Sequence, residues 1–149
     1  MSDAVSYEDY LAAHGSFTYT NVGTSMLPLL REGRDLFTVV PKGETRCRVG
    51  DVVLYRRPPS SYVLHRVVAL TDSGYLTLGD NCVARERVAE GDVIAVMTGF
   101  VRGGRTHDVG EKGYRAYTHL VLLAEHPRVV ARRLVVAVRQ RARRLAHGR

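Results

Sequence analysis

Four side chains of this sequence have the types needed for nucleophilic hydrolysis: Ser25, His65, Asp80 and Glu86. A serine hydroxyl is a weak nucleophile at neutral pH unless a base accepts its proton, and histidine is the most frequent base. A carboxylate beside the histidine holds the tautomer that accepts this proton. The residue types therefore predict a nucleophile at Ser25, a base at His65 and an orienting acid at Asp80 or Glu86. Unrelated enzymes use these groups in different chain orders, so the order excludes nothing.

Short apolar segments separated by turn residues predict the elements that must position these side chains. Ser6 can cap a helix over residues 6–14, and Gly15 ends it. Segments rich in β-branched and aromatic residues predict strands at 17–22, 36–40, 51–55, 62–70, 75–78 and 93–101. Ser25 then lies in a turn between the first two strands, and His65 lies within the fourth. Short strands with frequent turns predict a mainly β fold, a small coiled β-barrel or sandwich.

The last forty residues have a different character. Residues 114–124 fit a helix or a strand. After Pro127, a favourable first helical residue, Val130, Leu134, Val138 and Leu145 recur at helical spacing among many arginines. This pattern predicts a basic amphipathic helix. Two interpretations stay open: the helix packs on the β-domain with its arginines in water, or residues 127–149 lie on an anionic membrane or partner surface.

Composition and charge place the chain among soluble globular proteins. The chain has 149 residues, 45% of them hydrophobic and 25% charged, with a formal net charge of +7. Residues 1–119 carry equal numbers of basic and acidic side chains, so the positive charge belongs to the tail. The sequence predicts a β catalytic domain with its short helix at 1–110 and a basic helical extension at 111–149. The tail lacks interleaved aromatic residues for base stacking, which disfavours nucleic acid as a partner.

The sequence lacks a signal peptide, a membrane span and a metal-binding pattern, and these features bear on compartment and cofactors. The N-terminal residues lack the basic and apolar regions of a signal peptide, and 120–138 is too polar to span a bilayer. We therefore expect a cytoplasmic protein, with peripheral contact at the inner membrane face left open. The scattered histidines (His14, His107, His119, His126 and His147) and two cysteines make no metal set, so we expect no metal and no cofactor. Cys82 has no evident paired base.

Four motifs in this order resemble the signal peptidase I family, in its Ser-His branch from archaea, the endoplasmic reticulum and spore-forming bacteria. The motifs are Gly23-Thr24-Ser25-Met26-Leu27-Pro28, Gly50-Asp51-Val52-Val53, Leu64-His65-Arg66-Val67-Val68 and Gly79-Asp80-Asn81. The resemblance covers roughly residues 20–102. SOS-repressor autoproteases share the fold and the serine turn, but their base is a lysine. Histidine at the base position makes the Ser-His branch the closer match.

The resemblance implies an all-β catalytic core and a serine endopeptidase that removes a leader or signal segment from a peptide or preprotein bound in extended form. It implies that Ser25 attacks the scissile carbonyl and that His65 accepts and then donates the proton. The position of the family's orienting acid is occupied by Glu86, and Asp80 matches a second acid, so both stay candidates. Gly23 stands where many members have an oxyanion-binding serine, and with Thr24, Met26 and Pro28 it would border the oxyanion and substrate groove.

The chain also departs from the family in ways that keep other functions open. Typical signal peptidases have an N-terminal membrane helix, whereas this sequence begins with a short polar helix. The departure favours cleavage of a dedicated peptide or a regulatory protein over secretory processing. Two alternatives remain beside the enzyme. One is a non-catalytic β-domain that binds peptides in the same groove, and the other is a basic-tailed regulatory or nucleic-acid-binding module.

Overall fold

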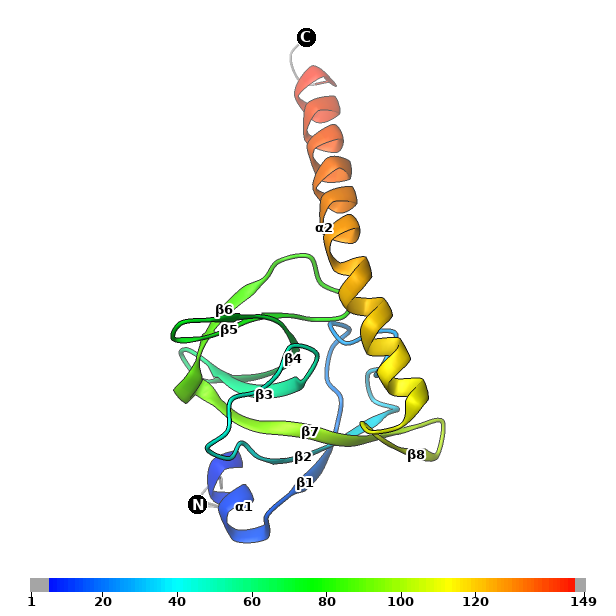
Figure 1. The fold of residues 1–149 in the computed structure, drawn as a ribbon. Helices are drawn as coiled ribbons and strands as arrows, with labels where there is room; N and C mark the ends of the chain where they lie inside the picture. Colours follow the sequence, from blue (N-terminus) through cyan, green and yellow to red (C-terminus); the bar gives the residue numbers. More distant parts are fainter. Residues whose placement is uncertain (1–5, 147–149) are drawn as a thin grey trace, which may run out of the picture.

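Eight strands form one antiparallel sheet in the structure, a computed structural model that describes residues 6–146 (Figure 1). The strands are β1 (Phe17–Thr20), β2 (Leu36–Pro41), β3 (Val52–Arg57), β4 (Ser61–Thr71), β5 (Gly74–Leu78), β6 (Glu86–Ala89), β7 (Val93–Arg102) and β8 (Arg105–Asp108). Their order is β1-β2-β7-β3-β4-β5-β6, and β8 pairs with β7. The mainly β prediction is confirmed, but the sheet is open, because its terminal strands β1 and β6 have only four residues each and do not pair with each other.

The N-terminal helix has the caps that its sequence predicts. Helix α1 spans Tyr7–His14, and the hydroxyl of Ser6 accepts a hydrogen bond of 3.1 Å from the Asp9 amide. Gly15 ends the helix at φ 75°, a left-handed conformation that costs glycine little. Leu11 anchors the helix by entering the hydrophobic core.

Strand β3 lies near the middle of the sheet and is buried on both faces. Successive side chains of a strand point to opposite faces. Val52 and Leu54 accordingly enter one core cluster, which also contains Met26, and Val53 and Tyr55 enter a second one. The partner strand β4 has the same division: His65 pairs with Val53 and Arg66 pairs with Val52. Two neighbouring residues of β4 therefore serve opposite faces of the sheet.

Two short strands, β6 and β8, are absent from the expectation based on sequence. In β6 only Val88 is buried, and in β8 no residue is buried, so neither has the apolar alternation that marks a strand. Both strands are held instead by backbone hydrogen bonds to a longer neighbouring strand. β6 pairs with β5, and the Gly103-Gly104 turn brings β8 back onto β7.

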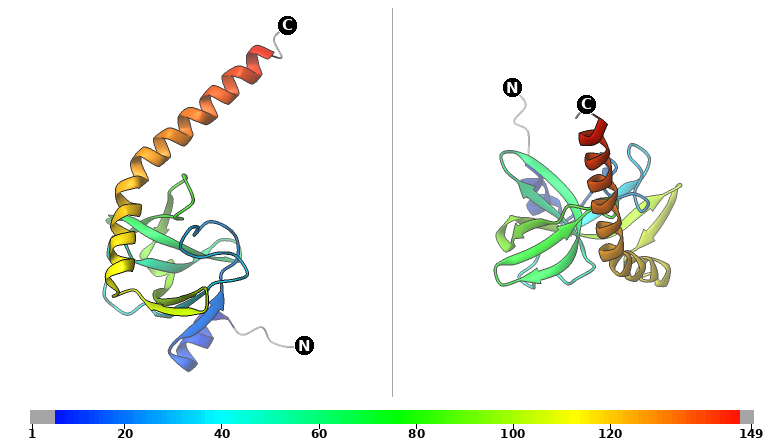
Figure 2. Two further views of the ribbon diagram at one scale, coloured as in Figure 1. Left: turned by 90° about the vertical axis from the view of Figure 1, so that its right-hand side faces the viewer. Right: turned by 90° about the horizontal axis from the view of Figure 1, so that it is seen from above.

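The C-terminal segment is one helix, α2 (Lys112–Ala146), which continues through Pro127. Residues 114–124 are therefore helical, and the helix begins at Lys112 and not at Pro127 as expected. The helix runs along the sheet, bends and then projects beyond it (Figure 2), as expected for a proline inside a helix. Glu125 and Val129 are its buried residues, whereas every residue from 131 to 146 is exposed. No helix among the described residues is both long and apolar enough to cross a membrane.

A buried ion pair joins β4, the turn after β5 and α2. The guanidinium of Arg66 donates two hydrogen bonds to the carboxylate of Asp80, at 2.8 and 2.7 Å, and both side chains are fully buried. A third guanidinium nitrogen donates to the Gly50 carbonyl at 2.8 Å. Burial alone would lower the pKa of Arg66, but the hydrogen bonds and charge of Asp80 outweigh it and raise that pKa above its ordinary value.

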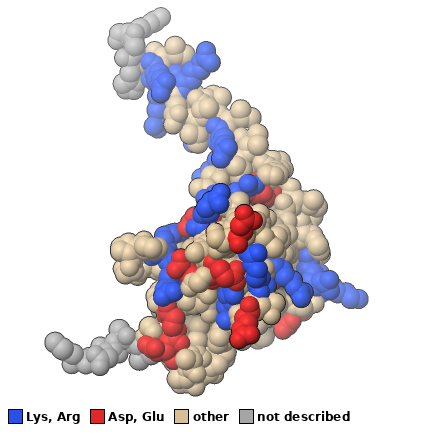
Figure 3. All heavy atoms as spheres, turned by 60° about the vertical axis from the view of Figure 1, so that its left-hand side comes forward, with Lys and Arg blue, Asp and Glu red and all other residues tan. Residues whose placement is uncertain are grey.

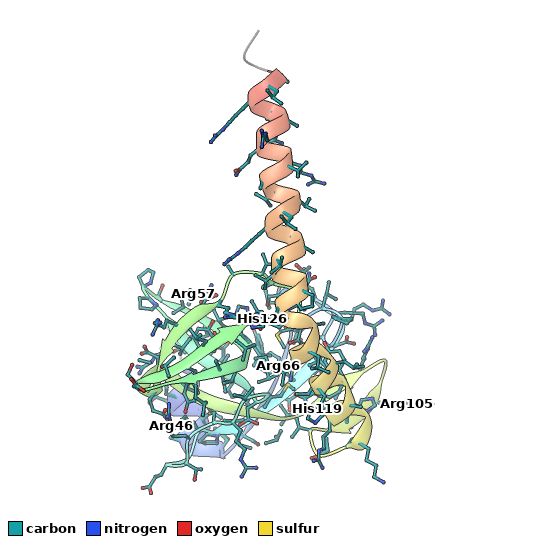
Figure 4. The ribbon with its side chains drawn as sticks, turned by 45° about the horizontal axis from the view of Figure 1, so that its top comes forward. Arg46, Arg57, Arg66, Arg105, His119 and His126 are labelled. Atoms are coloured by element: carbon teal, nitrogen blue, oxygen red, sulfur yellow. The ribbon has the colours of Figure 1, made fainter. Side chains whose placement is uncertain are left out.

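Helix α2 closes this ion pair from its outer side. Arg66 also contacts the hydroxyls of Tyr114 and Thr118, at 3.2 and 3.1 Å. The Tyr117 hydroxyl donates to Asp80 at 2.8 Å, and the rings of both tyrosines lie 5.7 Å from the guanidinium carbon. Figure 4 shows Arg66 where the sheet meets α2. We call these residues and Asp80 the Arg66 cluster: Arg66, Asp80, Tyr114, Tyr117 and Thr118.

Replacing Arg66 with leucine should cost the protein about 3–5 kcal/mol, because it leaves the buried Asp80 carboxylate without its partner. The double variant Arg66→Leu/Asp80→Leu should regain at least half of that loss. Urea unfolding provides the free energies. Arg56→Leu, on an exposed arginine of β3, is the control and should change stability by less than about 1 kcal/mol. A loss below 1 kcal/mol for Arg66→Leu would show that the cluster does not hold the fold.

Candidate active site

The loop that carries Ser25 is tied to the turn that follows β5. The amide N–H of Asn81 donates to the Ser25 carbonyl at 2.8 Å, and its side-chain amide donates to the Thr24 carbonyl at 3.2 Å. Asn81 directly follows Asp80, so the Arg66 cluster fixes the turn and the turn fixes the serine loop. Segments more than fifty residues apart in sequence are thereby held together.

The turn approaches Ser25 and His65 so closely that residue 79 has no room for a side chain. A Cβ atom at Gly79 would lie 2.7 Å from the Ser25 carbonyl oxygen, 2.7 Å from Cys82 Sγ and 3.0 Å from His65 Nε2. The Ser25 carbonyl oxygen and His65 Nε2 are therefore at most 5.7 Å apart, the sum of 2.7 and 3.0 Å. The structure thus brings residue 25 next to one particular nitrogen of the imidazole.

The other imidazole nitrogen of His65 faces a tyrosine and a carboxylate. His65 Nδ1 lies 3.2 Å from the Tyr55 hydroxyl and 3.6 Å from Glu86 Oε1. The hydroxyl of Tyr55 donates to Glu86 Oε2 at 3.0 Å, so its single proton is used. It therefore accepts from Nδ1–H, which leaves Nε2 as the unprotonated nitrogen on the Ser25 side. Tyr55 thus connects Glu86 to His65 and selects the tautomer that a general base would need.

Burial keeps this imidazole neutral. Desolvation is the largest influence on His65 and lowers its pKa below 6.5; Glu86 opposes the shift, whereas Arg57 adds to it. The pKa of Tyr55 rises to about 12, mainly through burial, so its hydroxyl keeps its proton. At neutral pH the pair is therefore a neutral imidazole and a neutral phenol, with the charge on Glu86 balanced by two contacts to Arg57.

A cavity of about 540 Å³ opens over these groups. Its lining includes Ser25, His65 and Glu86, together with two chain segments, 62–64 of β4 and 82–84. Arg57, from β3, also lines it. Helix α2 contributes Arg132, a residue beyond its bend. The nucleophile, base and acid candidates thus share one open cavity of peptide size.

The structure gives the two acid candidates different surroundings. Glu86 contacts the His65 side of the site directly and through Tyr55, whereas both carboxylate oxygens of Asp80 are occupied by Arg66 and Tyr117. Asp80 acts on His65 only as a distant charge that raises its pKa slightly. Asp80 is therefore placed to hold the turn, and Glu86 is placed to orient the base.

The residues expected along the groove are divided between the core and the loop. Met26 is fully buried in the first core cluster, and none of Gly23, Thr24, Met26 and Pro28 lines the cavity. The Gly23 amide already donates to Glu32 at 2.9 Å. Among this set, Thr24 supports the site through its carbonyl, and Pro28 follows a cis peptide bond in the loop. The Gly23 amide is therefore already engaged.

Tyr55, Asn81 and Arg132 contribute to the site without having been predicted from sequence. Tyr55 had a detectable signal, because the β3–β4 hairpin pairs Arg57 with Ser61 and counting back along it pairs Val53 with His65. Tyr55 then lies on the His65 face. Asn81 and Arg132 depend on the turn conformation and on the path of α2, which no local pattern predicts.

Cys82 lies in the cavity but lacks the features of a nucleophile. Burial raises the pKa of its thiol, so the unreactive protonated form prevails at neutral pH. The described residues hold no cluster of three potential metal ligands; His147 lies outside them. Comparison of the chain with protein-family models, with curated proteins and with solved structures finds no match in any of the three.

Acid should destabilise the protein through His65. The unfolded chain has the ordinary histidine pKa of about 6.5, whereas the folded value is lower, so the unfolded state binds a proton first. The free energy of unfolding should be constant with respect to His65 above pH 6.5 and fall as the pH drops below it. Urea unfolding on either side of this pH measures the slope. His65→Gln should flatten the slope, and the exposed His119→Gln should not; equal slopes in all three proteins would contradict the buried neutral imidazole.

Proposed function

We propose that this protein is a serine endopeptidase in which Ser25 is the nucleophile, His65 the general base and Glu86 the orienting acid. The observation that supports this proposal is the orientation of one imidazole. Its Nε2 faces the Ser25 loop, and its Nδ1 faces Tyr55 and Glu86. A buried histidine that merely filled the core would need a hydrogen-bond partner, but it would not need an open cavity beside it.

The chemistry follows from this arrangement in two stages. As Ser25 Oγ bonds to the scissile carbonyl carbon, its proton passes to His65 Nε2, and the imidazolium is stabilised by Glu86 and the Tyr55 hydroxyl. Nε2 then donates that proton to the leaving amine, which breaks the peptide bond and leaves an acyl-enzyme. A water molecule, deprotonated by the same nitrogen, attacks the acyl carbon. The bond to Ser25 Oγ then breaks as Nε2 returns the proton to that oxygen, which releases the carboxyl product and restores the serine hydroxyl.

The cavity favours a peptide in extended conformation as the substrate. Residues 62–64 and 82–84 both line the cavity, and an extended peptide bound there can pair with the backbone groups of such segments. The amide of Ser25 is the available oxyanion donor. Because the Gly23 amide is bound to Glu32 and residue 23 has no hydroxyl, we expect slower turnover than with two donors, by about 100-fold.

The finer assignment, a signal-peptidase-type fold that cleaves a leader or signal segment, belongs to this proposal as well. It is supported by the four sequence motifs. Three of them, the serine loop, His65 and the Gly79–Asn81 turn, meet at the site, and the fourth contacts Arg66 on the other face of β4 through the Gly50 carbonyl. The open sheet has a peptide-sized cavity where such an enzyme would bind its substrate.

Purified protein should cleave members of a mixed library of peptides at a reproducible set of sites, which mass spectrometry of new N-termini identifies. Ser25→Ala should lower the cleavage rate at these sites by at least about a thousandfold. Ser73→Ala, which removes the hydroxyl of an exposed serine in the turn between β4 and β5, is the matched control and should leave the rate within about threefold.

The outcomes separate the candidate functions. Cleavage that survives Ser25→Ala but disappears in Cys82→Ala would transfer the nucleophile to the thiol and contradict the proposal. Peptide binding of equal affinity in the wild type and in Ser25→Ala, with no cleavage in either, would identify a non-catalytic peptide-binding domain.

A further inference from the structure

The projecting half of α2 presents an uncovered apolar ridge. Val130, Leu134, Val138 and Leu145 follow one another at intervals of four, four and seven residues, which places them on one side of a helix. Their exposed fractions lie between 55% and 73%. The same side continues back to Leu120 and Leu123, which are 66% and 76% exposed although they lie beside the sheet. The helix thus turns Glu125 and Val129 towards the protein and its apolar side away from it.

Arginines occupy much of the rest of this helix, beside the exposed Val135 and Val136. Arg132, Arg139 and Arg143 lie opposite the ridge, and Arg133 and Arg144 flank it. Arg141 lies within the ridge, four residues before Leu145, and its long side chain can carry the charge to the edge of the apolar surface. No acidic residue occurs in the chain after Glu125. On the face that Figure 3 shows, the projecting helix carries blue side chains and no red ones, whereas both colours mix on the body. The helix therefore combines a mainly apolar ridge, interrupted at Arg141, with charge of one sign.

We propose that residues 127–146 of α2 bind the surface of an anionic lipid bilayer, lying in the interface with the apolar ridge towards the acyl chains. A helix of this kind buries its apolar side at the boundary of headgroups and chains, and its arginines reach the anionic headgroups. The twenty residues extend over about 30 Å at 1.5 Å per residue, parallel to the surface.

The charge and the ridge of the helix together argue against two other binding partners, a second copy of the chain and a nucleic acid. A second copy of the chain would bring arginines against arginines along both flanks of the ridge, with no acidic residue in this segment to pair with them. A nucleic acid would neutralise the arginines but leave the ridge uncovered. An anionic bilayer satisfies both features, because it offers negative headgroups and an apolar interior on one side of the helix.

This binding would place the candidate active site close to the membrane. Arg132 belongs to the bilayer-binding segment and also lines the cavity over Ser25, so the distance between lipid headgroups and cavity is about the width of one helix. The inference does not depend on catalysis, since nothing in it requires Ser25 to react.

Co-sedimentation of the full-length protein with vesicles tests the proposal. Protein should bind vesicles of phosphatidylcholine and phosphatidylglycerol in equal amounts, bind vesicles of phosphatidylcholine far more weakly, and be released by salt. Val138→Gln, on the ridge, should weaken binding about tenfold. Val136→Gln is the matched control: it changes the same residue type, also exposed, on the arginine side, and should change binding by less than about twofold. Arg139→Gln should weaken binding to the anionic vesicles about fivefold.

Three results would overturn the proposal. The first is no binding to the anionic vesicles at low salt. The second is self-association, seen by sedimentation without lipid, that Val138→Gln abolishes. The third is duplex DNA or RNA binding with a steep salt dependence in which Val138→Gln and Val136→Gln are both without effect. Because these assays contain no cleavage step, their result is separate from that of the peptide library.

Discussion

The ion pair between Arg66 and Asp80 is the interaction on which the rest of this structure depends. Two fully buried charges are costly to remove from water, and they are tolerated only when each hydrogen-bonding group finds a partner. Here the carboxylate receives three hydrogen bonds, and the guanidinium reaches a backbone carbonyl and two hydroxyls as well. This requirement brings β4, the turn after β5 and the first half of α2 into one arrangement, and the serine loop follows through Asn81.

The alternation of a β-strand lets one dipeptide serve structure and chemistry together. His65 and Arg66 are neighbours, but their side chains leave β4 on opposite faces. One reaches the cavity with Ser25 and Glu86; the other reaches α2 and Asp80. The two acids are separated in the same way. Asp80 binds Arg66 and Tyr117 on one face, and Glu86 contacts His65 and Tyr55 on the other.

Much of this fold can be predicted from sequence where the signal is local. The capped helix over Tyr7–His14 and the hairpin between β4 and β5 have signals within a few residues, and both occur in the structure. The polar strands β6 and β8 could not be predicted, because they depend on pairing with distant neighbours. For helix α2 the sequence predicts a boundary at Pro127, since a proline usually begins or ends a helix. In the structure the helix bends and continues through this residue.

The site shows the same limit. Ser25 and His65 could be named from their motifs, but sequence left Asp80 and Glu86 equal, because choosing between them requires the position of Arg66, a buried partner fourteen residues from Asp80. Tyr55 could be reached only by counting along the β3–β4 hairpin. Residue types thus indicate which chemistry is available, and tertiary contacts decide which group performs it.

Reaction with a fluorophosphonate tests most directly whether His65 activates Ser25. In this reaction the serine oxygen bonds to phosphorus, fluoride leaves and the proton passes to the imidazole, so no peptide substrate needs to be known. Mass spectrometry of the digested protein should find one adduct, on Ser25, formed at a rate that falls by about 100-fold or more in His65→Ala. An unlabelled Ser25, or equal labelling of Ser25 in His65→Ala, would contradict the account.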